Sequence, residues 1–236
     1  MKYDKEILKI REDVASMNVE LPVDVNGEFF PIISSYLKQG DKVLDVGTGN
    51  GFVLGRILAS NPGLSLEVFG LDNSQFMLEL ASEKLGNSAK LVYGSADRLP
   101  FPNNFFDIVV AKNVTRINCG EVSRVLKNNG MFIFREYGIG KGMKEVATMF
   151  PNRIIRQRPP DYYVKASIES GLSILRLKTY EFSVKYESAN EIVSIVSSYP
   201  FIEDFSESDK QAILEKFSND ATVTSDPFIL IAKKGR

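Results

Sequence analysis

The feature that most constrains the fold is an alternation of strand-like and helix-like segments between residues 42 and 135. Short apolar stretches rich in β-branched residues alternate with segments whose apolar residues recur at helical spacing, and loops with glycine or proline separate them. This alternation predicts parallel strands joined by helical crossovers, because each crossover helix must bury its apolar stripe against the sheet. We therefore expect an α/β fold with helices on both faces of a parallel sheet.

The expected elements follow this alternation and continue beyond it. Strands are predicted at residues 42–46, 66–71, 89–93, 105–111 and 131–135, and helices at 51–60, 74–85 and 121–127. Further helices are predicted at 1–16, 29–38, 141–150, 161–170, 189–198 and 208–217. Residues 172–186 should form one or two strands, and residues 227–233 a closing strand.

Composition narrows the chemistry that the chain can perform. The 236 residues include no histidine and one cysteine, and the formal net charge is -1. Without histidine the chain lacks the commonest general base near neutral pH and the commonest metal ligand, so we expect no metal site. The single cysteine, Cys119, cannot form an intrachain disulfide, which suits the cytoplasm. The balanced charge argues against nucleic acid as a partner, and no run of about 20 apolar residues is present to span a membrane.

A glycine-rich loop follows the first predicted strand, in the sequence Val-Leu-Asp-Val-Gly-Thr-Gly-Asn-Gly at residues 43–51. Glycine permits positive φ and a close approach of the backbone to a ligand, and the helix that follows presents free amides. The spacing does not fit the G-x-G-x-x-G pattern of dinucleotide sites, because Phe52 or Leu54 stands where the third glycine belongs. Asp45, two residues before Gly47, is placed to receive an ammonium group directly or through water.

Acidic residues also follow the second and third predicted strands. Asp72 lies roughly 20 residues beyond the loop, where a carboxylate can accept both ribose hydroxyls of a nucleoside. Asp97 comes after the third strand, preceded by Ser95 and Ala96, and a carboxylate there can accept the exocyclic amino group of adenine. Because ligands of open α/β sheets bind beyond the carboxyl ends of the strands, the loop and the two acids should form one site.

Together these features resemble the class I S-adenosylmethionine-dependent methyltransferases over residues 42–136. The segments VLDVGTGNG, LDNS and GSADRLPFPNNFFDIVV resemble the family's first three motifs, and SRVLKNNGMFIF resembles its usual run before the fifth strand. The resemblance implies a Rossmann-like, seven-stranded, mostly parallel sheet with an antiparallel last strand, in which residues 172–186 pair with 227–233. It also implies S-adenosylmethionine as cofactor, with S-adenosylhomocysteine as product.

The resemblance further implies a set of cofactor-binding residues, which are Asp45, Gly47, Thr48, Gly49, Gly51, Asp72, Asn73, Ala96, Asp97, Arg98, Lys112 and Asn113. The glycines would pack on the methionine end of the cofactor, with the end of the fourth strand beside it. Asp72 would hold the ribose, and Asp97 with its neighbours would hold the adenine. Within a single domain, residues 1–40 would form a helical lid, 41–137 the cofactor-binding core, and 138–236 the substrate-side helices and closing strands.

The predicted reaction is methylation of oxygen or carbon on a small or medium-sized acceptor. The second half of the chain resembles the trans-aconitate, malonyl-carrier and quinone methyltransferases in its pattern of helices and strands. An RNA or protein methyltransferase, or a non-catalytic S-adenosylmethionine-binding protein, is the alternative. The segment between Ala111 and Glu121 is shorter than in most of the family, which leaves open the acceptor, any catalytic base and the oligomeric state.

Several other residues receive an interpretation from their type and position. The cluster Arg153, Arg156 and Arg158 is typical of a solvated surface, and its functional alternative is a clamp for an anionic acceptor. Asp107 is expected to cap or pair locally at the start of the fourth strand. Cys119 is expected to be an inert small side chain rather than a nucleophile.

Overall fold

The computed structural model describes residues 21–114, 116–155, 158–199 and 201–235. The helix predicted at residues 1–16 lies outside this part of the chain. The described chain divides into two compact units. The sheet unit comprises Val25–Glu136, Pro160–Lys178 and Phe228–Arg236, and the small unit comprises residues 21–24, Tyr137–Pro159 and Thr179–Pro227.

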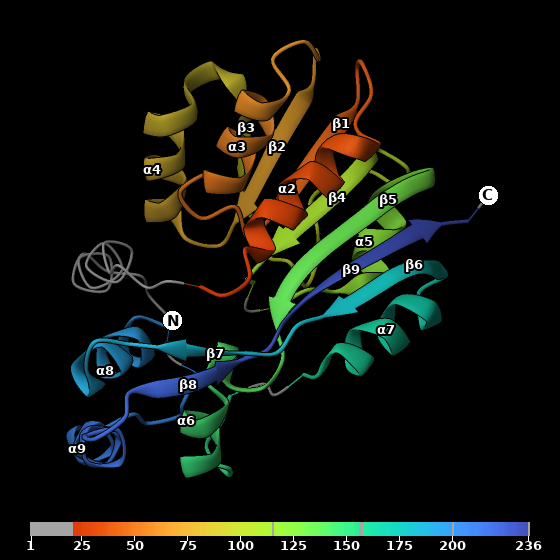
Figure 1. Ribbon diagram of the computed structural model, residues 1–236. Helices are drawn as coiled ribbons and strands as arrows, with labels where there is room; N and C mark the ends of the chain where they lie inside the picture. The colour runs from red at the N-terminus through yellow and green to blue at the C-terminus, as the bar shows by residue number, and fades with distance from the viewer. Residues whose placement is uncertain (1–20, 115, 156–157, 200, 236) are drawn as a thin grey trace. The chain divides into compact units, whose positions relative to one another are not determined.

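The sheet unit contains a seven-stranded sheet in the order β3-β2-β1-β4-β5-β9-β6 (Figure 1). Its strands are β1 (Lys42–Val46), β2 (Glu67–Asp72), β3 (Lys90–Tyr93), β4 (Phe106–Lys112), β5 (Leu126–Tyr137), β6 (Leu172–Thr179) and β9 (Pro227–Lys234). Strands β1 to β5 pair in parallel, and β9 runs opposite to β5 and β6 in Figure 1. The predicted mostly parallel sheet of seven strands with an antiparallel last strand is therefore confirmed.

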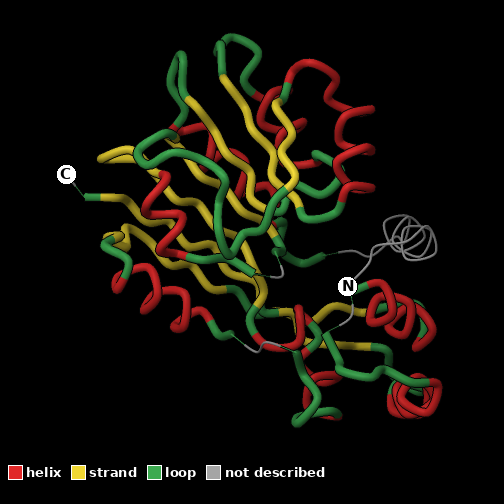
Figure 2. The backbone as a smooth tube through the Cα atoms, turned by 180° about the vertical axis from the view of Figure 1, so that it is seen from behind, coloured by secondary structure: helices red, strands yellow, loops and turns green. Residues whose placement is uncertain are grey.

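Helices lie on both faces of this sheet (Figures 1 and 2). They are α2 (Val25–Tyr36), α3 (Phe52–Ser60), α4 (Gln75–Leu85), α5 (Cys119–Val125) and α7 (Pro160–Glu169), with a 3₁₀ turn η1 at Gly86–Ser88. On one face, strand residues such as Val46 and Phe134 form a buried cluster with Val122 of α5 and Tyr163 of α7. Because both faces are covered, the middle of each central strand is mostly apolar and buried, as its sequence indicated.

Capping side chains fix where two of these helices begin. The Ser74 hydroxyl accepts a hydrogen bond from the Met77 amide at 3.3 Å, so α4 starts at Gln75, one residue after the predicted start. The Asn118 carboxamide oxygen accepts from the Gly120 amide at 3.0 Å. Helix α5 therefore begins at Cys119, two residues before the predicted start.

The small unit consists of short elements around its own core. These are η2 (Ile139–Gly142), α6 (Lys144–Met149), β7 (Phe182–Lys185), α8 (Ala189–Ser198), α9 (Glu207–Lys216) and β8 (Thr222–Ser225). Strands β7 and β8 pair antiparallel, with Val184 opposite Val223. Ile192 of α8 and Ile213 of α9 are fully buried in the same cluster as these valines.

Two strand predictions need correction. The strand predicted at 131–135 is the end of the longer β5, which already pairs with β4 at Leu126 and has an irregular register before Met131. Residues 172–186 do not pair as a whole with the closing strand, since β6 lies beside β9 whereas β7 pairs with β8. Strand β8 was not predicted, because its sequence Thr-Val-Thr-Ser is short and mostly polar. Within the described residues, every helix is too short or too polar to cross a lipid bilayer.

Candidate functional site

The glycine loop joins β1 to α3 in a conformation that only glycine adopts readily. Gly47, Gly49 and Gly51 have φ angles of 73°, 53° and 76°. A Cβ atom added to Gly47 would lie 2.6 Å from Cγ1 of Val114, and one added to Gly51 would lie 2.7 Å from Cδ1 of Leu85. The loop therefore needs glycine both for its backbone angles and for the close packing around it.

Asp72 at the end of β2 is joined directly to this loop. Its carboxylate accepts a hydrogen bond from the Gly49 amide at 2.9 Å and another from the Ser74 amide at 2.9 Å. The amides of Gly47 and Thr48 donate to the carbonyl of the residue just before Asp72, at 2.8 and 2.9 Å. The structure thus brings together the loop and the acid predicted to hold a ribose, although they are far apart in sequence.

Asp45 lies beneath the loop in β1 and is fully buried. Neither carboxylate oxygen has a hydrogen-bond partner among the described residues, and the Thr48 hydroxyl is also buried without one. Burial raises the pKa of Asp45 from 3.8 to about 7, although the Thr48 hydroxyl, which lies close to the carboxylate but outside hydrogen-bond geometry, and the nearby Lys112 ammonium oppose this change. Buried polar groups in folded proteins are normally hydrogen-bonded, so a carboxylate left without partners beside a ligand loop indicates that a ligand group completes it.

Lys112 and Asn113 lie at the end of β4, as predicted. The Lys112 ammonium is 5.4 Å from the ring centroid of Phe52, the first residue after the glycine loop. Burial and the positive charge of Arg135 lower the pKa of Lys112 from 10.5 to about 8. Asn113 is exposed, has a φ of 55°, and its side-chain oxygen accepts a hydrogen bond from the Arg135 guanidinium.

The remaining predicted residues lie in loops after β2 and β3. Asn73 is exposed, and Ala96 is partly buried against the core of the sheet unit. Asp97 is exposed and forms an ion pair with Arg116 at 2.8 Å. An adenine amino group that binds the Asp97 carboxylate would therefore have to share it with Arg116 or displace Arg116 from it.

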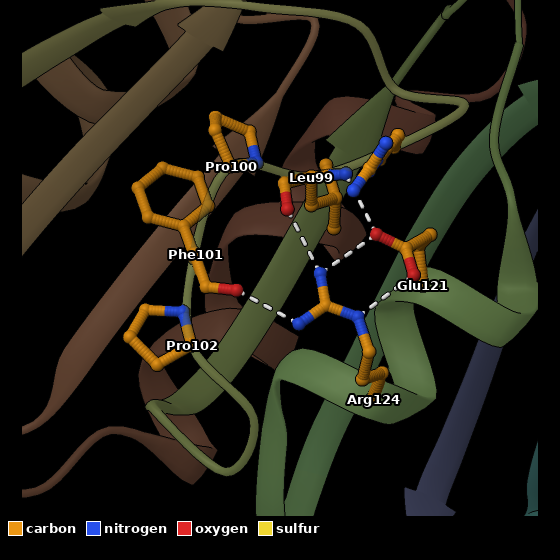
Figure 3. A pocket seen from close by; sticks show the side chains of 7 residues that line it. Leu99, Pro100, Phe101, Pro102, Glu121 and Arg124 are labelled. Carbon is orange, nitrogen blue, oxygen red and sulfur yellow. Dashed lines mark hydrogen bonds and ion pairs between the residues drawn. The ribbon is translucent and has the colours of Figure 1, made fainter.

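Arg98 lines a shallow pocket that is formed by the loop after Asp97 and by α5 (Figure 3). Arg124 in this pocket donates to the Leu99 and Phe101 carbonyls at 2.8 Å each and to the Glu121 carboxylate at 2.7 Å. Because the Arg124 guanidinium already bonds the surrounding loop and helix, this pocket is a structural junction. Arg98 and Glu121 thus line the same pocket, and the role of Arg98 at the adenine stays a prediction.

Three further polar residues were given no role from the sequence. Arg135 and Glu136 of β5 are 5% and 1% exposed, and Arg135 lies opposite Lys112 in the β4–β5 register. In the first turn of α2, the side-chain oxygen of Asn26 is buried without a partner among the described residues. The signal for the β5 residues was present, because charged residues directly follow the apolar run Met-Phe-Ile-Phe at a predicted strand end.

Two of the structural interpretations from the sequence agree with the structure. Asp107 pairs locally, since it accepts a hydrogen bond from the Lys42 amide at 2.9 Å and forms an ion pair with Lys127 at 2.7 Å. Cys119 is a buried small side chain within the sheet unit, and its sulfur accepts a hydrogen bond from the Ser167 hydroxyl at 3.7 Å. The arginine cluster differs from the expected solvated surface, because Arg153 binds the Asp209 carboxylate with two nitrogens, at 2.9 and 2.8 Å, within the small unit. Arg156 lies outside the described residues.

Comparisons with known proteins agree with this geometry. Residues 43–130 match a family described as a methyltransferase domain. The chain is 34% identical over 117 residues to the ubiquinone/menaquinone biosynthesis C-methyltransferase UbiE of Neisseria meningitidis, which covers 46% of this chain and 47% of UbiE. It is 31% identical over 165 residues to the uncharacterized methyltransferase YcgJ of Bacillus subtilis, which covers 62% of this chain and 63% of YcgJ. The chain thus spans about half the length of the UbiE proteins that it matches.

Solved structures share the fold over most of the chain. The crystal structure of YcgJ has a TM-score of 0.64 and 19% identity, covering 89% of this chain and 99% of YcgJ. The [4+2]-cyclase SpnF also has a TM-score of 0.64, with 16% identity over 97% of this chain and 93% of SpnF. At these identities the likeness establishes the fold. The segment that matches the methyltransferase-domain family, residues 43–130, also contains the glycine loop and Asp72.

Proposed function

We propose that this protein transfers the methyl group of S-adenosylmethionine to oxygen or carbon of a small or medium-sized acceptor. The observation that carries the proposal is the buried Asp45 carboxylate without partners, directly beneath a glycine loop that is hydrogen-bonded to Asp72. When bound, the cofactor supplies an electrophilic methyl group on a sulfonium, so the protein needs chiefly to bind, orient and exclude water.

The residues at the strand ends fit the polar groups of this cofactor. Asp45 would receive the ammonium group of the methionine part, which would complete its hydrogen bonding. Each carboxylate oxygen of Asp72 accepts one backbone amide and retains capacity for a ribose hydroxyl. The backbone of Gly47 and Gly49 would pack against the cofactor. The Asp97 carboxylate would accept a hydrogen bond from the adenine amino group, which would replace part of its exposed ion pair with Arg116.

The acceptor is proposed to be a small molecule on the grounds of charge. The formal net charge is -1, and a docking surface for RNA would need a concentration of positive charge. Inside the sheet unit, Lys112 and Arg135 lie at adjacent strand ends, and a sulfonium would add a further positive charge, so an acidic or anionic acceptor is favoured. The cytoplasm remains the proposed location, consistent with a single buried thiol at Cys119.

A second candidate function has one specific observation in its favour. The same fold occurs in SpnF, which is described as a [4+2]-cyclase. The fold alone therefore does not require methyl transfer, and a role that uses the bound cofactor only as a structural ligand is the competing hypothesis.

Two measurements test these proposals in order. Titration calorimetry should detect binding of both S-adenosylmethionine and S-adenosylhomocysteine to the full chain, and an absence of heat and of any thermal shift with both ligands would refute the cofactor site. A labelled-methyl assay against a metabolite extract, with identification of the product, should then show transfer. Tight cofactor binding with no transfer to any acceptor in the extract would favour the non-methylating role.

A further inference from the structure

One aspartate of the small unit ties together the segments that follow β5 and precede β9. Asp226 lies between β8 and β9, and its Oδ2 atom accepts a hydrogen bond from the Ile139 amide at 3.1 Å. The backbone carbonyl of Asp226 accepts a second hydrogen bond from the Gly138 amide at 3.0 Å. Ile139 is the first residue of η2, so Asp226 holds the start of the loop at residues 138–143, which we call the post-β5 loop.

The Asp226 side chain packs so tightly on this loop that residue 138 must be glycine. A Cβ atom added to Gly138 would lie 2.3 Å from Oδ2 of Asp226. That separation is far below a van der Waals contact, so the carboxylate occupies the space that a side chain would need. The close approach of carboxylate and backbone is therefore specific to the glycine at this position.

The post-β5 loop is held in a strained conformation. Gly140, Lys141 and Gly142 follow one another with φ angles of 71°, 54° and 82°. The left-handed region is costly for a residue with a Cβ atom, so Lys141 adopts it only because the surrounding contacts impose it. The Tyr137 ring is one such contact, since it lies against Gly142, and the hydrogen bond from the Ile139 amide is another. Weakening one of these contacts should make the loop easier to open.

Charged groups surround the Asp226 carboxylate on α6 and on the segment before β7. The Lys144 ammonium of α6 is near enough to favour the ionised form of Asp226. Lys144 also forms an ion pair with Glu181 and feels the charge of Glu145, so three carboxylates share its positive charge. The other charged residue of the loop is Lys141.

Burial outweighs these favourable charges at Asp226. Its Oδ1 atom is buried and has no hydrogen-bond partner among the described residues. The pKa of Asp226 is consequently raised from 3.8 to about 6, although the Ile139 amide, the Lys144 ammonium and the backbone oppose this change. The contact that holds the loop thus involves a carboxyl group that is poorly stabilised when it is charged.

We propose that the Asp226 carboxyl group is a pH-sensitive latch, which holds the post-β5 loop closed when it is protonated and releases the loop more readily when it is ionised. This inference goes beyond the proposed function and does not depend on it. The loop continues directly from the carboxyl end of β5, and ligands of open α/β sheets bind at that edge. The latch would therefore make the chain beyond this edge more mobile at neutral pH than in acid.

The direction of the pH dependence follows from the two states of the carboxyl group. In the closed loop its pKa is about 6, whereas in an open loop the solvated group would return to its ordinary value near 3.8. Between these values the closed loop retains a proton that the open loop releases. The free energy of opening is therefore highest in acid, falls between about pH 4 and pH 6, and changes no further above that range.

The test is amide hydrogen exchange measured by NMR on the full chain between pH 4 and pH 7.5. Each exchange rate is divided by the intrinsic rate at the same pH, so that only the protection of the amide is compared. The full difference in pKa would lower the protection of the Ile139 amide about 100-fold, and partial exposure of the carboxyl group reduces this effect. We expect a loss of about 10- to 100-fold between pH 4 and pH 6.5, with constant protection above that.

Two substitutions of Asp226 separate its charge from its hydrogen bond. Asp226→Asn keeps an oxygen acceptor for the Ile139 amide but cannot ionise, so protection should stay at its acid value at every pH. Asp226→Ala removes the acceptor and should lower the protection at pH 4 at least 10-fold, with no dependence on pH. Thermal unfolding checks that each variant folds, and Asp226→Asn decides the question alone if Asp226→Ala does not fold.

A matched control is Glu145→Gln, which changes another carboxylate of the small unit that accepts a backbone amide, that of Thr224 at 2.6 Å. This variant should keep the pH profile of the Ile139 amide within two-fold of the wild type. Slowly exchanging amides of β4, such as that of Val110, report opening of the sheet unit. If the Ile139 amide has the same protection at pH 4 and pH 6.5, or loses it equally in the wild type and Asp226→Asn together with Val110, the latch is overturned.

Discussion

Replacing Asp45 by asparagine should stabilise the unliganded protein and at the same time weaken cofactor binding. The side chain is fully buried, its oxygens lack partners among the described residues, and its pKa is raised from 3.8 to about 7. Between those two values the folded protein retains a proton that the unfolded chain has released. The free energy of unfolding therefore falls as the pH rises through this window, and the loss is complete above about pH 7.

The size of the effect follows from the same two values. At 1.36 kcal/mol per pH unit, the difference between 3.8 and about 7 corresponds to a loss of about 4 kcal/mol at pH 8. Asparagine removes the charge but leaves a buried polar amide without good hydrogen-bond partners. We therefore expect the variant to recover about half of the lost unfolding free energy at pH 8, or about 2 kcal/mol. Binding of S-adenosylhomocysteine should weaken at least 10-fold, because the ammonium of the ligand loses its carboxylate.

The assay is urea unfolding of the wild type and Asp45→Asn at several values between pH 4 and pH 8, with calorimetry for the ligand. The difference in unfolding free energy between the variant and the wild type should change by about 4 kcal/mol across this range, from about 2 kcal/mol in favour of the wild type near pH 4 to about 2 kcal/mol in favour of the variant at pH 8. Asp226→Asn is the matched control, since burial raises the pKa of that carboxyl in the small unit to about 6. The stability advantage of Asp226→Asn over the wild type should stop growing near pH 6, and the variant should bind the ligand as the wild type does. Parallel pH profiles for the wild type and Asp45→Asn would refute the reasoning.

Four further predictions concern the loop, the site charges and the structural junction. Asp72→Ala should weaken binding of S-adenosylhomocysteine by about 1–3 kcal/mol in calorimetry, as charge-assisted hydrogen bonds are lost, and an unchanged affinity would contradict the ribose assignment. Affinity for S-adenosylhomocysteine should be highest between about pH 7 and pH 8, because the Asp45 carboxyl becomes charged near the lower pH and the Lys112 ammonium loses its charge near the upper pH. An affinity that does not change from pH 6 to pH 9 would argue against placing Asp45 and Lys112 in the ligand site. Arg124→Met should lower the free energy of unfolding in urea by about 2–4 kcal/mol and leave the affinity for S-adenosylhomocysteine within two-fold. If the variant instead loses ligand binding while its stability is unchanged, the Arg124 pocket belongs to the ligand site. Gly51→Ala should lower the free energy of unfolding by about 1–3 kcal/mol, because residue 51 has a positive φ and the new Cβ would contact Leu85 closely. Equal melting temperatures for the variant and the wild type would rule out this prediction.

The sheet region was predictable because its signals are local. The predicted strand at 42–46 has the bounds that the structure shows for β1, and the helix predicted at 74–85 differs from α4 by one residue at its start. The three loop glycines were recognisable from their spacing, and the structure shows the steric reason for them in the close approach of Val114 and Leu85. The strand, the helix start and the glycine pattern are thus visible within a few residues of sequence, whereas the contacts of Val114 and Leu85 with the loop are long-range.

Other features were not predictable because they depend on distant parts of the chain. Strand β8 forms only because β7 pairs with it, and its own four residues carry little strand signal. The pair of Asp97 with Arg116 joins two loops, and no local pattern links an acid to an arginine 19 positions away. Similarly, the placement of Arg135 beside Lys112 is a property of the β4–β5 register, which sequence periodicity does not specify.

Four of the charged side chains, Arg124, Arg153, Asp45 and Lys112, differ in how the protein satisfies them, and the difference supports the proposed site. Arg124 and Arg153 bind several acceptors each, so their charges are satisfied by the protein and stabilise the junctions that they join. Asp45 and Lys112 lie beside the glycine loop and gain no such partners from the described residues, although a direct pair would lower the free energy of the folded state. A protein under selection for stability alone would replace or pair them. Their retention is explained if the ligand supplies the missing partners, in which case binding energy offsets the destabilisation that the unliganded fold tolerates.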